Sequence, residues 1–254
     1  MAMQTVVFKD LGTMSYRQAW DYQERLLQQN LRAKSLMTGV AAPLVADDPP
    51  PGWPDPQQAL AGTTHYLLMV EHPPVYTLGK SGHPEHILID EKTMEARGIE
   101  FFRTNRGGDI TFHGPGQIVA YPVLDLEKFY TDIGKYLRNL EEVIIRVMAD
   151  YGLQGERSLG QTGVWLDARL PGKERKICAM GVRCSRWITM HGLAFNVNTD
   201  LSYFNDIIPC GIRNKQVSSL ELETGRKWDM EDVKNRIKNQ FEVVFDCSLS
   251  TALI

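Results

Sequence analysis

The chain has 254 residues, of which 43% are hydrophobic and 23% are charged, and its formal net charge at pH 7 is −3. These values exclude a disordered or collagen-like chain, and the absence of a basic excess argues against a nucleic-acid partner. No apolar run reaches the ~18 residues of a membrane helix, and the N-terminus carries no signal or transit peptide pattern. Four cysteines are too few for a disulfide framework in a chain of this size. We therefore expect a cytoplasmic protein with reduced thiols and no membrane contact.

The N-terminal part begins with a strand and a long helix. Residues 5–10 have a strand pattern, and a capping box formed by Ser15 and Gln18 begins an amphipathic helix that runs to about residue 35. Residues 41–62 hold six of the 13 prolines, which deprive the backbone of amide donors. This segment is expected to be a surface insertion in a single catalytic domain that spans residues 1–254.

The rest of the chain alternates hairpins with helices at irregular intervals, which predicts an α+β fold rather than a repeated βαβ fold. The turn His72-Pro73-Pro74 joins two expected strands, and the turn at residues 170–173 closes an expected hairpin. The strands are predicted at residues 65–71, 75–78, 100–104, 118–122, 163–167, 176–183 and 187–196. The helices are predicted at residues 91–97, at residues 131–151, and from an Asp229 cap onward.

The segment from Arg106 to Gln117 has the highest density of candidate functional residues. It contains four glycines, at positions where bare backbone would let a ligand approach the main chain. Arg106 adds a charge and His113 a polar ring. Composition alone leaves two interpretations open, a ligand-binding loop and a tight hairpin turn. The segment has neither the Walker pattern nor Gly-x-Gly-x-x-Gly spacing.

Cys210 lies between a proline and a glycine, which predicts a turn on which a thiol is accessible. A free cysteine is usually a small buried hydrophobe, and a nucleophilic one needs a nearby base or cation. The histidines and Lys176 are the candidates for that partner, although a lysine at the mouth of a strand is more often solvated. His191, in an apolar strand, is either a hydrogen-bonded core residue or part of a pocket wall.

Together these segments resemble the lipoyl(octanoyl) transferase family, which moves an octanoyl group from acyl carrier protein to a lysine of lipoyl domains. The motifs occur in the family's order over most of residues 65–222. They are Arg-Gly-Gly-x-x-x-x-His-Gly-Pro-Gly-Gln at 106–117, Tyr-Pro-x-Leu-Asp-Leu at 121–126, Gly-Val-Trp at 163–165, Lys-Ile-x-x-x-Gly-x-Arg at 176–183, His-Gly-Leu-Ala-x-Asn-Val at 191–197, Asp-Leu-Ser at 200–202 and Pro-Cys-Gly at 209–211.

The resemblance implies a fold like the catalytic domain of biotin and lipoate protein ligases, a mixed β-sheet with packed helices. It implies a catalytic dyad of Cys210, which carries the acyl group as a thioester, and Lys176, which handles its proton. Backbone amides near Gly107, Gly108 and Gly192 are expected donors to the oxyanion. The implied substrate-binding residues are Arg106, Gly107, Gly108, Asp109, Ile110, Thr111, Phe112, His113, Ala179, Met180, Gly181, His191, Gly192, Leu193 and Ala194.

The implied partners are acyl carrier protein, lipoyl domains of 2-oxoacid dehydrogenase complexes and the glycine cleavage H protein, and no ATP or metal is expected as a cofactor. Cys178 departs from the small non-thiol residue common in the family, and either replaces an alanine or competes for acyl groups. Three alternatives stay open at this stage: an ATP-dependent lipoate or biotin ligase of the same fold, a cysteine thioester hydrolase, and a non-catalytic carrier-binding module.

Overall fold

The computed structural model describes residues 3–39, 50, 52–55, 62–208 and 216–251. Most of the expected insertion at residues 41–62 lies outside the described residues, and so does the predicted nucleophile Cys210. None of the described helices is long and apolar enough to cross a membrane.

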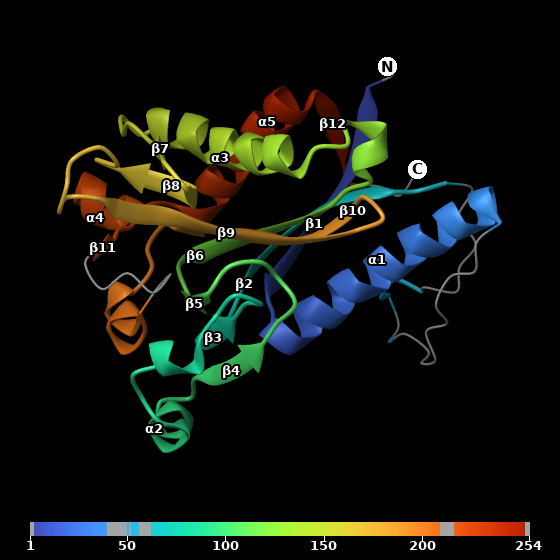
Figure 1. Ribbon diagram of the computed structural model, residues 1–254. Helices are drawn as coiled ribbons and strands as arrows, with labels where there is room; N and C mark the ends of the chain where they lie inside the picture. The colour runs from blue at the N-terminus through green and yellow to red at the C-terminus, as the bar shows by residue number, and fades with distance from the viewer. Residues whose placement is uncertain (1–2, 40–49, 51, 56–61, 209–215, 252–254) are drawn as a thin grey trace.

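A mixed β-sheet forms the centre of the molecule (Figure 1). Within the described residues it has nine strands, in the order β12-β1-β2-β6-β10-β9-β8-β7, with β11 paired to β9. β1 pairs in parallel with β12 and β2, β11 pairs in parallel with β9, and the remaining neighbours are antiparallel. The strands are β1 (Gln4–Thr13), β2 (His65–Glu71), β6 (Gln117–Val123), β7 (Glu156–Ser158), β8 (Gln161–Leu166), β9 (Arg175–Ser185), β10 (Ile188–Asn196), β11 (Gln216–Val217) and β12 (Cys247–Ser250).

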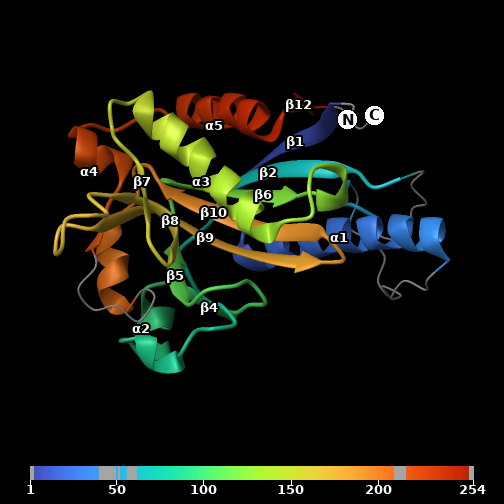
Figure 2. The same ribbon diagram turned by 45° about the horizontal axis from the view of Figure 1, so that its top comes forward.

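Helices cover both faces of this sheet (Figures 1 and 2). α1 (Tyr16–Thr38) lies on one face, and α3 (Ile133–Ala149) and α5 (Met230–Phe245) lie on the other. Alternate residues of β2 point to opposite faces, as the period of two of a strand requires. Leu67 therefore packs in the cluster with α3 and α5, and Leu68 packs in the cluster with α1.

A smaller sheet, in the order β4-β3-β5, lies beside the central one and packs a third hydrophobic cluster. Its strands are β3 (Val75–Leu78), β4 (Glu100–Arg103) and β5 (Ile110–His113). The short helices are α2 (Glu91–Ala96), α4 (Leu220–Thr224), η1 (Pro84–His86), η2 (Leu126–Lys128) and η3 (Leu201–Asp206).

The α+β class, the three long helices and the hairpin of β8 with β9 are confirmed. Ser15 caps α1 by accepting a hydrogen bond from the Gln18 N–H, as the capping box predicts. The chain near His72 differs from a hairpin, because β2 and β3 belong to different sheets. Buried His72 contacts the Met14 carbonyl and the Tyr121 hydroxyl, both at 2.8 Å, and these contacts hold a corner between the two sheets.

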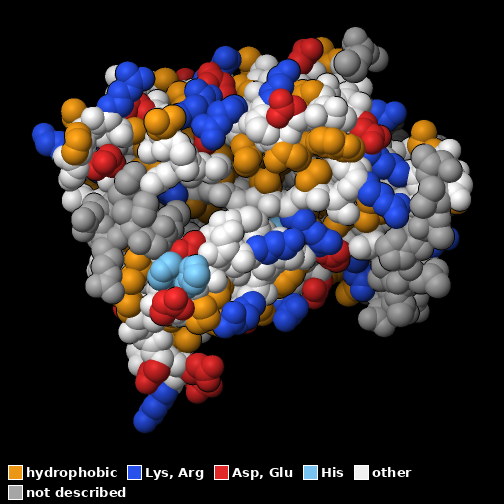
Figure 3. All heavy atoms as spheres, in the orientation of Figure 1, with side chains coloured by type: hydrophobic (Ala, Val, Ile, Leu, Met, Phe, Trp, Pro, Cys, Tyr) orange, Lys and Arg blue, Asp and Glu red, His pale blue; other side chains and the backbone are white. Residues whose placement is uncertain are grey.

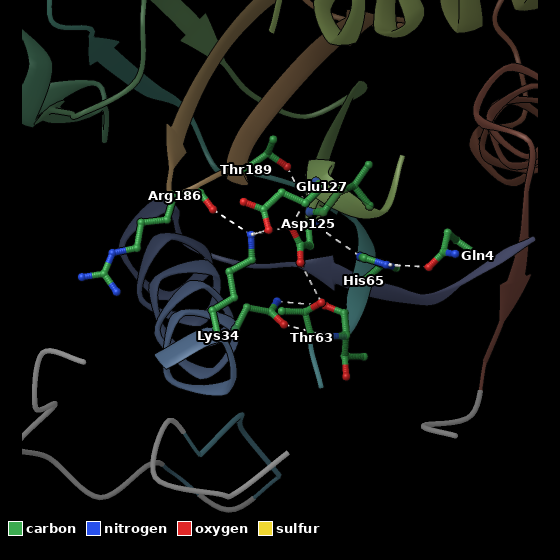
Figure 4. A network of polar contacts seen from close by, with 11 residues as sticks. Gln4, Lys34, Thr63, His65, Asp125, Glu127, Arg186 and Thr189 are labelled. Atoms are coloured by element: carbon green, nitrogen blue, oxygen red, sulfur yellow. Dashed lines mark hydrogen bonds and ion pairs between the residues drawn. The ribbon is translucent and has the colours of Figure 1, made fainter. Parts of the chain in front are cut away.

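Asp125 of the Tyr-Pro-x-Leu-Asp-Leu motif forms a buried ion pair, which gives this motif residue a structural role. Figure 4 shows Lys34 of α1 reaching between Asp125 and Glu127. Its Nζ lies 2.6 Å from Asp125 Oδ1 and 3.1 Å from Glu127 Oε2. The Thr63 hydroxyl donates to the other Asp125 oxygen, and the Asp125 N–H donates to His65 Nδ1. The motif thus ties α1 to the end of β6.

We expect Asp125→Ala to lower the free energy of unfolding by about 3 kcal/mol, because it leaves a largely buried ammonium without its buried partner. Glu127→Ala is the matched control and should cost less than about 1 kcal/mol, since Glu127 is half exposed. Urea unfolding of both variants gives the comparison. Equal losses in the two variants would contradict a special role for Asp125.

Candidate active site

A cavity of about 970 Å³ is lined by both sheets and by α3. Its size is at the upper end for pockets that hold small-molecule ligands. Fourteen of the fifteen expected substrate-binding residues line it, and so does Lys176. The lining residues among them are Arg106, Gly107, Gly108, Asp109, Ile110, Thr111, His113, Ala179, Met180, Gly181, His191, Gly192, Leu193 and Ala194.

Phe112 is the residue of that set that does not line the cavity. It is 1% exposed and belongs to the hydrophobic cluster of the small sheet. Its ring stacks on Tyr203, with 4.5 Å between ring centroids. The Arg106–His113 segment contains the strand β5, whose alternation sends Phe112 to the core. Phe112 therefore supports the wall from behind instead of contacting a ligand.

Two glycines let the backbones that frame the cavity come close together. A Cβ on Gly181 would lie 2.6 Å from the Gly107 carbonyl oxygen, and a Cβ on Gly192 would lie 2.1 Å from the Ala120 carbonyl oxygen. Gly181 and Gly192 are register partners in β9 and β10. Only glycine fits at either position, so close packing of the backbones accounts for these two glycines of the motifs.

Arg106 fastens the glycine-rich loop to the small sheet. Its guanidinium donates to the Thr77 carbonyl at 2.6 Å, to the Thr77 hydroxyl at 2.9 Å and to the Gly107 carbonyl at 3.0 Å. The Gly107 N–H donates to the Val182 carbonyl at 3.0 Å. The expectation that the Gly107 amide donates to an oxyanion is therefore wrong, because this N–H is already hydrogen-bonded to the backbone of β9.

A chain of hydrogen bonds fixes the tautomer of His113. The Gln117 amide nitrogen donates to the Phe112 carbonyl and to Asn196 Oδ1, so the Gln117 oxygen is the acceptor for His113 Nδ1–H at 2.8 Å. His113 Nε2 is then left to accept from the Thr77 hydroxyl at 3.3 Å. Burial holds the pKa of His113 well below its usual value, so the ring is neutral.

Two more neutral histidines are His72, whose ring lies beside that of His113, and His191, which lines the cavity. Burial lowers the pKa of His72 to about 4 and that of His191 to about 3. His191 Nε2 lies 2.7 Å from Asn105 Oδ1, and its Nδ1 has no hydrogen-bond partner in the part of the chain that the structure describes. His191 is both a buried residue and part of the cavity wall, so the two interpretations of its sequence context are compatible.

Several lining residues were not identified from the sequence. Three of them, Gln117, Tyr121 and Asn196, lie within the family motifs given above. Their place in those motifs was the only sequence feature that could have marked them as lining residues. Tyr16 comes from α1, where no local pattern marks it, and its ring stacks on His113 with 5.9 Å between centroids. Its role appears only when the chain folds.

Lys176 is positioned by the Gly-Val-Trp motif on the neighbouring strand. Its Nζ lies 4.6 Å from the centroid of the Trp165 ring. Gly163 has a φ of 120°, and a Cβ there would lie 2.5 Å from the Cys178 carbonyl oxygen and 3.5 Å from Lys176 Cε. The bare backbone of Gly163 thus leaves room for the lysine side chain, and the ring of Trp165 attracts its ammonium group.

Backbone contacts flank the segment that carries the predicted nucleophile. On one side the Ile208 N–H donates to the His86 carbonyl at 2.8 Å. On the other side Val217 pairs with Lys176, and the Ser218 N–H donates to the Lys176 carbonyl at 2.9 Å. Residues 209–215 themselves lie outside the described residues, so the dyad of Cys210 with Lys176 stays a prediction.

Cys178 is a core residue. Its side chain is fully buried, and burial raises the pKa of its thiol well above the usual value. A thiol in such surroundings is a poor nucleophile. The interpretation of Cys178 as a replacement for a small residue is supported, and the structure gives no access for an acyl donor.

The stability of the protein should depend on pH because it buries neutral histidines. Burial lowers the pKa of four of them, to about 4 for His65, and the others are His72, His113 and His191. In the unfolded chain each takes up a proton below about pH 6.5. The unfolded state then binds more protons, so the free energy of unfolding falls as the pH drops from 7 to 5, by up to about 1.4 kcal/mol per histidine per pH unit. Proton uptake on unfolding at pH 5.5 measures this effect, and an uptake below one proton would contradict it.

Comparison with known sequences places the chain among related enzymes. The family model "Lipoyl protein ligase A/B catalytic domain" matches residues 15–242. An octanoyltransferase of Flavobacterium johnsoniae is 51% identical over 247 residues, which are 96% of this chain and 98% of that protein. An octanoyltransferase of Christiangramia forsetii is 49% identical over 247 residues, which are 96% and 97% of the two chains.

Solved structures share the fold at much lower identity. The bi-partite lipoate protein ligase of Thermoplasma acidophilum superimposes with a TM-score of 0.64 at 16% identity, over 99% of this chain and 88% of that one. Lipoate-protein ligase A bound with ATP gives a TM-score of 0.61 at 15% identity, over 100% and 90% of the two chains. At these identities the likeness concerns the fold alone, and it confirms the expected mixed sheet of lipoate ligases.

Proposed function

Because the chain belongs to the lipoyl protein ligase A/B catalytic-domain family, we propose that it is an acyltransferase that moves an octanoyl group from octanoyl-acyl carrier protein to a lysine of lipoyl domains in lipoate biosynthesis. The observation that carries the proposal is the cavity, which is lined by Lys176, by the glycine-rich loop and by β9 and β10. The high identity to octanoyltransferases over both full lengths supports the choice of acyl group.

The donor half-reaction uses the thiol of Cys210 and the amine of Lys176. Lys176 accepts the thiol proton, and the thiolate forms a bond with the octanoyl carbonyl carbon. The bond to the phosphopantetheine sulfur breaks, and that sulfur takes the proton back from Lys176. The Trp165 ring supports this step because it attracts the ammonium group that forms on Lys176.

The acceptor half-reaction forms an amide. The amine of a lipoyl-domain lysine attacks the octanoyl thioester on Cys210, the C–N bond forms and the C–S bond breaks. Lys176 carries a proton from the nitrogen to the departing sulfur. An amide is more stable than a thioester, so we propose that the reaction needs neither ATP nor a metal.

The ATP-dependent ligase is the nearest alternative, because solved ligases share the fold. Those ligases are 15–16% identical to this chain, whereas the octanoyltransferases are 49–51% identical. Sequence likeness therefore favours transfer. A hydrolase would need water in place of the amine, and no observation favours it. We place the enzyme in the cytoplasm, where its described cysteines, all free, would stay reduced.

We expect incubation with octanoyl-acyl carrier protein to add one octanoyl mass to the wild-type protein and none to Cys210→Ala. Cys178→Ala is the matched control and should be labelled like wild type, because Cys178 is buried. Intact-protein mass spectrometry reads the result. Equal labelling of wild type and Cys210→Ala would defeat the proposal, and product made from ATP and free octanoate without a carrier would favour a ligase.

We expect Lys176→Ala to slow acylation at pH 7 by about 10²-fold or more, since a general base of this kind contributes at least that much. Raising the pH should restore part of the rate, because a larger fraction of the thiol ionises without help. Lys176→Arg is the informative comparison, because a guanidinium keeps the charge but does not exchange its proton. Acylation rates that are unchanged in both variants would remove Lys176 from this role.

A further inference from the structure

The cavity wall holds a histidine–carboxylate pair that the proposed cycle does not use. His86, at the end of η1, has its Nδ1 2.6 Å from Asp109 Oδ2, and both residues line the cavity. The His83 N–H donates to the other Asp109 oxygen at 3.3 Å. The side chains of His86 and Asp109 are 18% and 10% exposed. In Figure 3, histidine and acidic side chains adjoin on this face of the molecule, over β5.

The contact determines which nitrogen of His86 is a base. An ionised carboxylate only accepts hydrogen bonds, so the proton of the neutral ring is on Nδ1 and the lone pair is on Nε2. Within the described part of the chain Nε2 has no hydrogen bond. A carboxylate that holds an imidazole in one tautomer is a recurrent way to orient a histidine base.

The pair lies next to the predicted nucleophile segment. The His86 carbonyl accepts from the Ile208 N–H, and Ile87 forms an antiparallel bridge with Ile207. Cys210 follows Ile208 by two residues. The described residues that flank 209–215 thus contact His86 on one side, through Ile208, and Lys176 on the other, through Val217 and Ser218.

The acceptor half-reaction needs one more proton acceptor than the dyad offers. A lysine side chain with its usual pKa of about 10.4 arrives as an ammonium ion at neutral pH. It loses two protons on becoming an amide N–H. The departing sulfur of Cys210 takes one of them through Lys176, and the other needs a second base.

We propose that His86, oriented by Asp109, is that second base, an inference that rests on the proposed function. His86 Nε2 takes one proton from the incoming ammonium group, and the neutral amine then attacks the octanoyl carbonyl carbon. The C–N bond forms, the C–S bond breaks, and the second nitrogen proton passes through Lys176 to the Cys210 sulfur. His86 finally releases its proton to solvent. The donor half-reaction involves no ammonium substrate, so it does not need His86.

The test separates the two half-reactions. Octanoylated protein is first prepared with octanoyl-acyl carrier protein and isolated, and is then mixed with a lipoyl domain in single-turnover reactions followed by mass spectrometry. The variants are His86→Ala, His86→Gln and Asp109→Asn. His83→Gln is the comparison variant: the His83 ring lines the cavity 5.4 Å from that of His86, but its side chain is mostly exposed and only its backbone contacts Asp109.

We expect His86→Ala and His86→Gln to slow transfer to the lipoyl domain by about 10²-fold, while acylation stays within about threefold of wild type. Added imidazole should restore transfer in His86→Ala in proportion to its concentration, and octanoylated protein without a lipoyl domain gives the background for direct cleavage by imidazole. Asp109→Asn should show a smaller loss of transfer, and His83→Gln should match wild type.

Two results would overturn the inference. Equal losses in both half-reactions without imidazole rescue would mean that His86 only anchors the neighbouring backbone. Transfer at the wild-type rate in both His86 variants would exclude it as a base. Failure of the proposed function gives a different result, because the wild-type protein would then acquire no octanoyl group in the first step.

Discussion

The buried guanidinium of Arg106 is the constraint on which the cavity depends. It binds the backbone and the hydroxyl of Thr77 in β3 and the carbonyl of Gly107 in its own loop. A charged group that is 7% exposed is tolerated only when hydrogen bonds replace its water. The Thr77 hydroxyl also hydrogen-bonds to His113, and His113 hydrogen-bonds to Gln117 of β6. Two sheets and one loop are thereby held in a single arrangement.

The histidines and the lysine at the cavity divide into two kinds. His113 and His191 line it and are buried and neutral, so they supply shape and hydrogen bonds without adding a charge to the wall. His86 contacts Ile208, which precedes residues 209–215, and Lys176 contacts Val217 and Ser218, which follow them; proton exchange is expected at these two residues. Under the proposed function, this separation would let the octanoyl chain lie against neutral groups while proton exchange takes place at Lys176 and His86.

The sequence predicted the elements whose signals are local. Caps and periodicity identified α1, α3 and α5, and the ordered motifs identified the part of the cavity wall that the glycine-rich loop, β9 and β10 form. Contacts between distant residues were not predictable in this way. The corner at His72 depends on Met14 and Tyr121, which lie far away in the chain. The pairing of His86 with Asp109 spans 23 residues, and no pattern in either segment indicates the other.

A structure of the octanoylated protein, prepared without a lipoyl domain, tests the central claim most directly. The account predicts electron density for an eight-carbon chain inside the cavity against Met180, Leu193 and Ala194, joined through its carbonyl to the sulfur of Cys210, with Lys176 Nζ within hydrogen-bond distance of that sulfur. An acyl chain bonded to another residue, or one that lies outside the cavity, would contradict it.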